Sequence, residues 1–207
     1  IFAENKGTGA LSITTTGTTT SKNDDGISAK NDGTSLTIEA ATTTGVTSGI
    51  YANNYGSGAL SITTTGDTTG GADFGGIDAF NKGTSLTIEA ATTTGGDFGI
   101  FAENKGTGAL SITTTGTTTG GKGGINAYNE GTSLKINTLT TTTGGENGIV
   151  AVNSGTGALS ITTMGDTTGT DKNGINAYNK GTSLTIKAAT TTGGTFGIAA
   201  TNFGTGA

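Results

Sequence analysis

Residues 1–20 read IFAENKGTGALSITTTGTTT, and residues 100–119 repeat the same twenty letters. The stretch belongs to a unit, G-I-x-A-x-N-x-G-[TS], that recurs along the whole chain, although the first copy lacks its leading Gly. The Ile of the unit stands at Ile1, Ile27, Ile50, Ile77, Ile100, Ile125, Ile149, Ile175 and Ile198. Self-similarity at a fixed spacing identifies a repeat architecture. An active site is built once from dissimilar side chains, so exact duplication predicts a scaffold and argues against an enzyme.

Apolar residues alternate within each unit. Ile100, Ala102 and Asn104 share one side, and Leu110 and Ile112 follow after a Gly turn. Alternation with a period of two predicts strands rather than helices. The units are 23 to 27 residues long and of two alternating kinds, so that, counted from Ile1, the pair repeats every 49 or 50 residues. Each unit therefore predicts two or three short strands, followed by a TTTG or DTTG segment.

Short strands that recur about every 24 residues, with no helix to connect them, predict an all-β fold in which coils stack ~4.8 Å apart. We expect a right-handed parallel β-helix, or β-solenoid, because parallel connections are right-handed by default. Eight full coils and a partial one would form a rod ~40 Å long. Since the chain starts and stops inside the repeat, we expect residues 1–207 to be a single solenoid segment excised from a longer array.

The composition fits an ordered but thin protein. The chain has 40 Gly, 30% hydrophobic and 12% charged residues, and no Pro, Cys, Trp, His or Arg. These are too few large apolar side chains for an ordinary globular core, yet disordered chains are usually rich in charge or Pro. Without Cys there is no disulfide or thiolate–metal framework, and without His and Arg the commonest general base and phosphate clamp are missing. We therefore predict no catalytic residue, metal or cofactor.

Charge and hydropathy narrow the range of partners. Ten Lys stand against fifteen acidic residues, so nucleic acid is not an expected partner. No apolar run approaches membrane-spanning length, and no signal peptide is present, so we do not expect this segment to be embedded in a membrane.

One Asn occupies the same place in every unit, two residues before a Gly. In a stacked solenoid these side chains predict an asparagine ladder at the inside of a turn, each amide bonding to the next coil. The alternative is that Asn stands there because it tolerates a left-handed backbone. Either role is structural. The predicted ladder consists of Asn5, Asn31, Asn54, Asn81, Asn104, Asn129, Asn153, Asn179 and Asn202.

Aromatic residues recur at outward positions of the G-I-x-A-x-N segment. On adjacent strands they would be diagonal neighbours and would form a zigzag stripe along the rod, which could bind a partner. The alternative is that aromatic side chains simply suit a pleated sheet surface. The predicted stripe consists of Phe2, Tyr51, Phe80, Phe101, Tyr128 and Tyr178; Val150 extends it and Lys30 interrupts it.

The array of G-I-x-A-x-N-x-G-[TS] units with LSIT and LTIE segments resembles the repetitive passenger domains of bacterial autotransporters, the surface adhesins and haemagglutinins of the AIDA and pertactin type. The resemblance spans the whole chain. It implies an extracellular stalk or fibre at the bacterial cell surface, used for adhesion, aggregation or filament assembly. The partners it implies are other copies of the chain, or glycans and proteins of a host or cell surface.

Two other functions are kept open. Regular Thr columns on a flat face could match an ice lattice. Ser111, Thr113 and Thr115 would face outward, but Glu39, Glu89 and Lys187 would interrupt that column in the intervening coils. The TTT segments at 42–44, 92–94, 117–119 and 190–192 keep ice binding open, and the high β propensity of Thr on solvated strands is the alternative explanation for them. The third function is a polysaccharide-active β-helix, for which two carboxylates would be needed. The acidic residues Asp24, Asp25, Asp73, Asp97, Glu146 and Asp171 are instead expected to be solvated turn residues.

Overall fold

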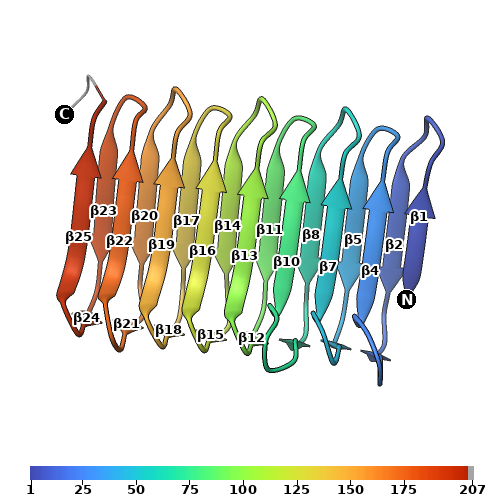
Figure 1. Cartoon of the computed structure of the whole chain (residues 1–207), viewed down its shortest axis with the longest axis horizontal. Helices are drawn as coiled ribbons and strands as arrows, with labels where there is room; N and C mark the ends of the chain where they lie inside the picture. The colour runs from blue at the N-terminus through green and yellow to red at the C-terminus, as the bar shows by residue number, and fades with distance from the viewer. Residues whose placement is uncertain (205–207) are drawn as a thin grey trace.

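The computed structural model describes residues 1–204, and these residues form strands but no helix. Each full coil has three strands, and each strand pairs in parallel with its equivalents in the neighbouring coils (Figure 1). In Figure 1 the front strands run upward, the strands behind them run downward, and the coils advance leftward from the N-terminus, so the winding is right-handed. The predicted right-handed parallel β-solenoid, with eight full coils and a partial one, is confirmed. The predicted segment also includes residues 205–207, which lie outside the described residues.

The strands form three sheets, in which each sheet takes one strand from every coil. The first sheet consists of β1 (Phe2–Asn5), β4 (Ile27–Asn31), β7 (Ile50–Asn54), β10 (Ile77–Asn81), β13 (Phe98–Asn104), β16 (Gly123–Asn129), β19 (Asn147–Asn153), β22 (Asn173–Asn179) and β25 (Phe196–Asn202). The second consists of β2 (Leu11–Thr15), β5 (Leu36–Ala40), β8 (Leu60–Thr64), β11 (Leu86–Ala90), β14 (Leu110–Thr114), β17 (Leu134–Thr138), β20 (Leu159–Thr163) and β23 (Leu184–Ala188). The third consists of β3 (Thr19–Thr20), β6 (Thr43–Thr44), β9 (Thr68–Thr69), β12 (Thr93–Gly95), β15 (Thr118–Gly120), β18 (Thr142–Gly144), β21 (Thr167–Gly169) and β24 (Thr191–Gly193).

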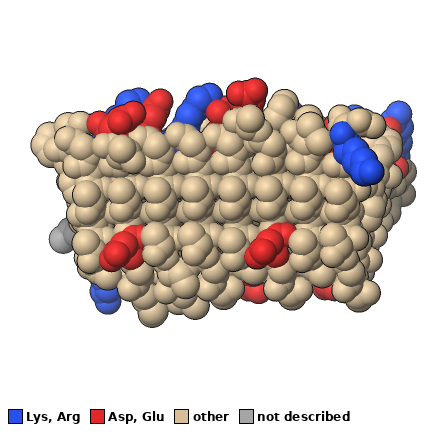
Figure 2. All heavy atoms as spheres, turned by 90° about the horizontal axis from the view of Figure 1, so that it is seen from below, with Lys and Arg blue, Asp and Glu red and all other residues tan. Residues whose placement is uncertain are grey.

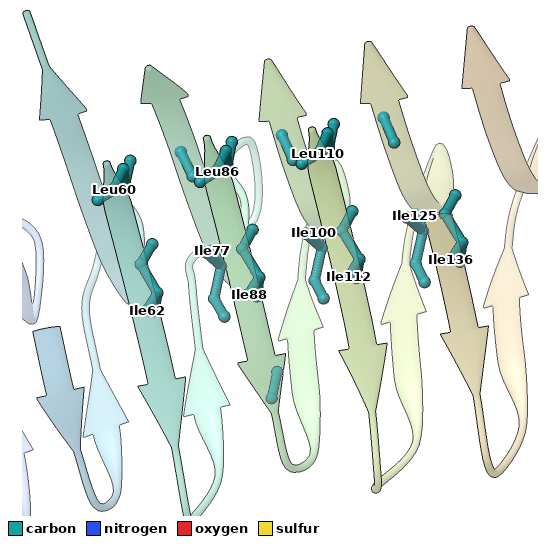
Figure 3. Close-up of a cluster of buried hydrophobic side chains, with 14 of the residues drawn as sticks. Leu60, Ile62, Ile77, Leu86, Ile88, Ile100, Leu110, Ile112, Ile125 and Ile136 are labelled. Carbon is teal, nitrogen blue, oxygen red and sulfur yellow. The ribbon is translucent and has the colours of Figure 1, made fainter. Parts of the chain in front are cut away.

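The core is a set of columns in which like residues stack on like. Leu86 pairs with Leu110 and Ile88 with Ile112, and all four side chains are fully buried. Ile77 and Ile100 stack in the same way from the first sheet (Figure 3). Alternation of period two thus sends one side of every strand inward, and the repeat makes each level of the core a copy of the level before it.

The third sheet contributes a threonine to this interior. Thr68, the first residue of β9, is fully buried, and its methyl group lies 2.7 Å from the position that a Cβ on Gly49 would take. Thr118 stands in the same relation to Gly99, at 2.6 Å. The coil is therefore so narrow at this corner that a glycine must face each inward threonine. In the TTT segments of the third sheet, the middle threonine points into the rod.

Glycine also sets how closely successive turns approach. A Cβ on Gly83, two residues after the ladder Asn of its coil, would overlap the carbonyl oxygen of Gly58 in the preceding coil. Among the described residues no glycine has a positive φ. The glycine of this turn is therefore needed for space and not for a left-handed backbone.

Candidate functional site

The predicted asparagine ladder is continuous. The Nδ2 atom of Asn5 donates to Oδ1 of Asn31 at 2.7 Å, and seven further bonds of 2.7–2.9 Å carry the chain of amides to Asn202. The asparagines from Asn31 to Asn179 are buried. Among the described residues, neither glycine nor any other residue has a positive φ. The left-handed alternative is therefore wrong, and the hydrogen bonds of the ladder explain why Asn occupies this place.

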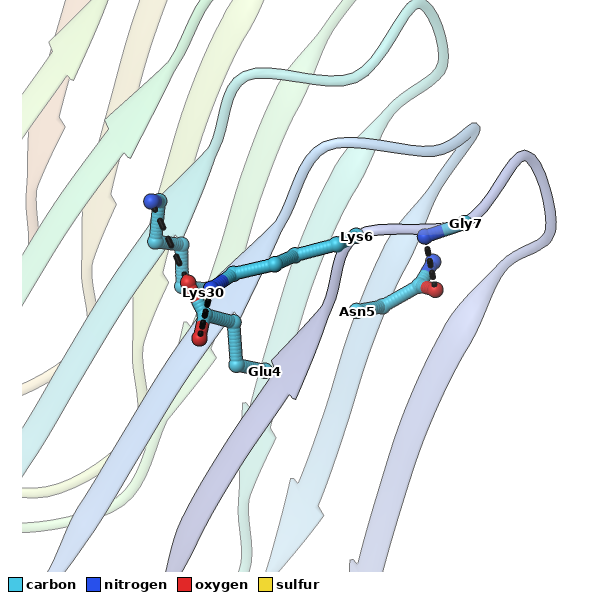
Figure 4. A network of polar contacts seen from close by, with 5 residues as sticks. All are labelled: Glu4, Asn5, Lys6, Gly7 and Lys30. Atoms are coloured by element: carbon cyan, nitrogen blue, oxygen red, sulfur yellow. Dashed lines mark hydrogen bonds and ion pairs between the residues drawn. The ribbon is translucent and has the colours of Figure 1, made fainter.

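Each ladder amide also fixes the turn that follows it. Asn104 donates to the carbonyl oxygen of Gly108 at 3.1 Å and accepts from the backbone N–H of Gly106 at 3.3 Å. The same turn begins with Gly7 N–H donating to Asn5 Oδ1 at 3.0 Å in the first coil (Figure 4). These turn bonds orient both ends of the amide, so the ladder serves the fold and offers no ligand site.

Glu4, on the outward side of the first sheet, forms one ion pair within its coil and one with the next coil. The carboxylate of Glu4 lies 3.2 Å from Lys6 Nζ and 3.3 Å from Lys30 Nζ on the adjacent strand (Figure 4). Hydrogen bonds from these two ammonium groups hold the pKa of Glu4 below its usual value. All three groups are solvated, so the pairs contribute little to stability.

The six residues of the predicted aromatic stripe occupy outward positions of the first sheet. Phe2, Tyr51 and Phe101 take the first x of the motif, whereas Phe80, Tyr128 and Tyr178 take the second. Within the stripe, one ring contact is formed, between Phe101 and Tyr128 with centroids 5.8 Å apart. Three other rings complete the remaining pairs, as Tyr55–Phe80 at 5.5 Å, Phe98–Phe101 at 5.6 Å and Tyr178–Phe203 at 5.1 Å. The aromatic surface is therefore a set of clusters, and its role in binding stays a prediction.

Between two of these clusters lies an open groove of about 360 Å³ over β7, β10 and β13. Tyr51 and Phe101 stand on either side of Asp78 in one register, because Asp78 pairs with Tyr51 of β7 and with Phe101 of β13. Asn53, Tyr55 and Phe80 line the rest of the groove. The groove therefore has two aromatic walls and a carboxylate between them.

Asp78 is held in place from one side. The Ser48 hydroxyl and, at 3.3 Å, the Gly75 N–H donate to its Oδ2. Burial raises the pKa of Asp78, an effect that these two hydrogen bonds oppose and that the nearby charges of Asp25 and Asp97 reinforce. Within residues 1–204, no group donates to Oδ1. One carboxylate oxygen thus keeps its full capacity to accept a hydrogen bond.

Two further acidic side chains, Asp25 and Asp97, lie near Asp78 but outside the lining of the groove. Asp25 accepts from the Thr47 hydroxyl and, at 3.0 Å, from the Ser48 N–H, and Asp97 pairs with Lys122 at 2.6 Å. Asp24 and Asp73 are exposed, as expected for solvated turn residues, but Asp25 and Asp97 are half-buried. No group of three or more acidic side chains within residues 1–204 is arranged to hold a metal ion.

A second regular surface is the outward side of the third sheet, which Figure 2 views directly as a flat face of repeated rows. One row is threonine in every coil and stays in register: Thr20, Thr44, Thr69, Thr94, Thr119, Thr143, Thr168 and Thr192. The residues two positions earlier form the other row: Thr18, Thr42, Asp67, Thr92, Thr117, Thr141, Asp166 and Thr190. We call these two rows the threonine face.

The outward side of the second sheet is less regular. Its register aligns Thr14 with Glu39, Thr63 with Glu89, and Thr162 with Lys187. The predicted interruption of this column by Glu39, Glu89 and Lys187 is therefore confirmed, and Ser111, Thr113 and Thr115 face outward as predicted.

Sequence reasoning missed Asp78 as a member of the groove, together with Asn53 and Tyr55. The available signal was positional, since Asp78 occupies the same first x of the motif as Tyr51 and Phe101 in the flanking units. Aligning the units by their Ile would have brought the three residues together.

Comparison of the chain with protein-family models, with curated proteins and with solved structures finds no match. In the described part of the chain, no helix has the length and apolarity needed to cross a membrane.

Proposed function

We propose that this chain is a segment of a rigid, non-enzymatic rod at the bacterial cell surface, of the autotransporter passenger kind, which presents its first sheet for adhesion or aggregation. The observation that supports this is the constant register from β1 to β25, in which each ladder Asn pairs with the next. Every coil consequently displays its outward side chains at the same place on the rod. Such repetition suits a surface that is built to display contacts at regular intervals.

Adhesion can be tested by displaying the chain on laboratory bacteria and measuring both aggregation and attachment to erythrocytes. Replacing four stripe residues, Tyr51, Phe80, Phe101 and Tyr128, by Ser removes the central aromatic surface. We expect attachment or aggregation to fall, because aromatic side chains dominate the energetics of binding interfaces. The matched control replaces four outward threonines of the second sheet, Thr14, Thr63, Thr113 and Thr162, by Ser. If both quadruple variants attach and aggregate as the parent chain does, the aromatic surface has no role in adhesion.

A second copy of the chain is the partner that the ends of the rod favour. Within residues 1–204, β1 pairs only with β4 and β25 only with β22. Ile1 and Ile198 are 48% and 43% exposed, whereas the seven Ile residues between them in the same column are fully buried. An unpaired strand edge beside exposed core side chains is a template for further pairing. We expect sedimentation velocity to show association that grows with protein concentration, and a monomer at every concentration would contradict end-on assembly.

Ice binding is a second candidate function, and the threonine face is the observation that favours it. Strand geometry places its hydroxyl and methyl groups ~4.8 Å apart along the rod and ~6.6 Å apart across it, in a two-dimensional array that Asp67 and Asp166 interrupt. Thermal hysteresis of the purified chain tests this function. We expect Thr94→Lys and Thr119→Lys to abolish any hysteresis and the second-sheet control Thr63→Lys to preserve it. Absence of hysteresis at millimolar protein would remove this candidate.

A further inference from the structure

We propose that the groove over Asp78 binds a neutral glycan, with one sugar ring between Tyr51 and Phe101. This inference rests on the proposed adhesive function and names the ligand class for one part of that surface.

The two rings are spaced for a sandwiched ligand. Tyr51 and Phe101 are equivalent residues on β7 and β13, with β10 between them, so their backbones lie ~9.6 Å apart, which is two strand spacings. A ring packed on both sides needs two van der Waals contacts of about 3.5–4.0 Å, or ~7–8 Å in all. The slot therefore accommodates one saturated six-membered ring, whose C–H groups would meet the electron-rich faces of the aromatic walls.

The ring faces in the groove are not equally available. Lys82 Nζ lies 5.3 Å from the Tyr55 centroid and 5.9 Å from the Phe80 centroid, so an ammonium group already covers both rings. Tyr51, by contrast, is 43% exposed and makes no ring or cation contact with any described residue. Tyr51 is thus the open platform, and Phe101, braced by Phe98 and Tyr128, is the rigid wall opposite it.

The polar groups between the walls suit hydroxyl groups. Asp78 Oδ1 accepts no hydrogen bond from residues 1–204, and the Asn53 side chain, also at the groove, forms none with them. A carboxylate accepts from a hydroxyl, and an amide both donates and accepts, so together they can satisfy the mixed hydrogen bonding of a sugar. This pairing of a flat apolar face with hydroxyls at its edge distinguishes a glycan from an apolar peptide.

Charge decides between neutral and acidic glycans. The carboxylates of Asp25 and Asp97 lie near that of Asp78, and Asp97 is paired with Lys122. The Lys82 ammonium at the groove already lies over Tyr55 and Phe80. An anionic sugar between Tyr51 and Phe101 would bring a further negative charge against these carboxylates, at a cost that burial increases. The predicted ligand is therefore a neutral hexopyranose oligomer.

The test is calorimetric titration of the full chain with six neutral-sugar and acidic-sugar probes. The neutral probes are hexamers of β-1,4-glucose, β-1,3-glucose, α-1,4-glucose, β-1,4-mannose and N-acetylglucosamine, and the acidic probe is a hexamer of galacturonic acid. We expect at least one neutral probe to bind, with a Kd about tenfold higher or more for Tyr51→Ala and for Asp78→Asn. The control Phe196→Ala removes an exposed ring that belongs neither to the groove nor to the predicted stripe, and it should leave the Kd unchanged. Circular dichroism verifies that each variant folds.

Three results would overturn the inference: no neutral probe binds, the acidic probe binds as tightly as the neutral ones, or Tyr51→Ala binds as the parent chain does. Failure of the inference differs from failure of the proposed function. Bacteria that still attach through a rod without glycan affinity would disprove the ligand class alone. Glycan binding in solution without attachment by displayed rods would disprove the adhesive function alone.

Discussion

Asn81 Nδ2 donates a hydrogen bond of 2.8 Å to Oδ1 of Asn104, and both side chains are fully buried. The two residues lie in successive coils and in register on β10 and β13. The bond therefore ties one level of the rod to the next at a place that water does not reach.

Asn104→Ala should be among the most destabilising single substitutions in this chain. It removes the bonds to both Asn81 and Asn129 and leaves a buried amide group unsatisfied on each side, at a cost of about 2–4 kcal/mol in the free energy of unfolding. Denaturant titration measures this cost. Asn53→Ala, an outward Asn of the same sheet, is the control and should stay within about 0.5 kcal/mol of the parent chain. Equal effects of the two substitutions would show that the ladder does not stabilise the rod.

Thr118→Val should stabilise the protein. The Thr118 side chain is fully buried and its hydroxyl has no hydrogen-bond partner among residues 1–204, as is also true of Thr43, Thr68, Thr142 and Thr167. Replacing an unsatisfied hydroxyl by a methyl group removes a desolvation cost of about 1 kcal/mol, which the thermal unfolding midpoint would register as an increase. The neighbouring Thr119 faces outward, and Thr119→Val should leave the midpoint nearly unchanged. A lower midpoint for Thr118→Val would mean that the hydroxyl has a stabilising role.

Two equivalent glycines test the close approach of the coils. Gly83 and Gly7 both stand two residues after a ladder Asn, but a Cβ on Gly83 would overlap the carbonyl of Gly58, whereas a Cβ on Gly7 would meet only Asn5 Oδ1, at 3.2 Å. We expect Gly83→Ala to cost about 2 kcal/mol or more and Gly7→Ala about 1 kcal/mol or less. Denaturant midpoints of the two variants, compared side by side, give the answer, and similar losses would rule out crowding as the reason for glycine.

Asp78 should make stability depend on pH. Since burial raises its pKa in the folded chain, the folded state keeps the proton to a higher pH than the unfolded state does. The stability this group contributes is fully present below its ordinary pKa of about 4 and is lost as the pH rises through the folded value. We therefore expect the unfolding midpoint of Asp78→Asn, relative to that of the parent chain, to increase between pH 3 and pH 7.

The control for this titration is Asp73→Asn, which makes the same change in charge at an exposed position. Subtracting the parent midpoint at each pH removes the contribution of the other carboxylates. A difference for Asp78→Asn that shrinks as the pH rises would contradict the assigned direction.

The sequence was sufficient to predict the elements whose pattern is local. The alternation of Ile100, Ala102 and Asn104 predicts a strand with one buried side. The constant place of Asn within the repeat unit predicts that Asn104 stacks on Asn81 and Asn129. The inward direction of Thr118 was not predicted, because a run of identical threonines has no alternation that would reveal which member is buried. Its direction is set by the glycine that faces it across the coil, Gly99.

The groove could not be predicted from any single repeat unit, because its residues come from three successive coils. The burial of Asp78 comes from Ser48 and Tyr51 in the preceding coil and from Phe101 in the next one. The loops that join these coils differ in length, so the environment of Asp78 follows from register across the stack and not from its own neighbours in sequence. The outward positions of the aromatic residues were predictable, whereas their ring partners Tyr55, Phe98 and Phe203 were not, because these lie outside the two x positions of the motif.

All eight amide-to-amide bonds of the asparagine column point the same way, with the donor on the earlier coil and the acceptor on the later one. Their dipoles add instead of cancelling, and aligned hydrogen bonds polarise one another. The rod consequently has a direction, because at every level the amide donor faces the coil that follows and the amide acceptor faces the coil that precedes. Copies of the chain that join through their ends can continue this column only head to tail. A filament made from this chain would therefore be polar, with two chemically different tips that can grow at different rates.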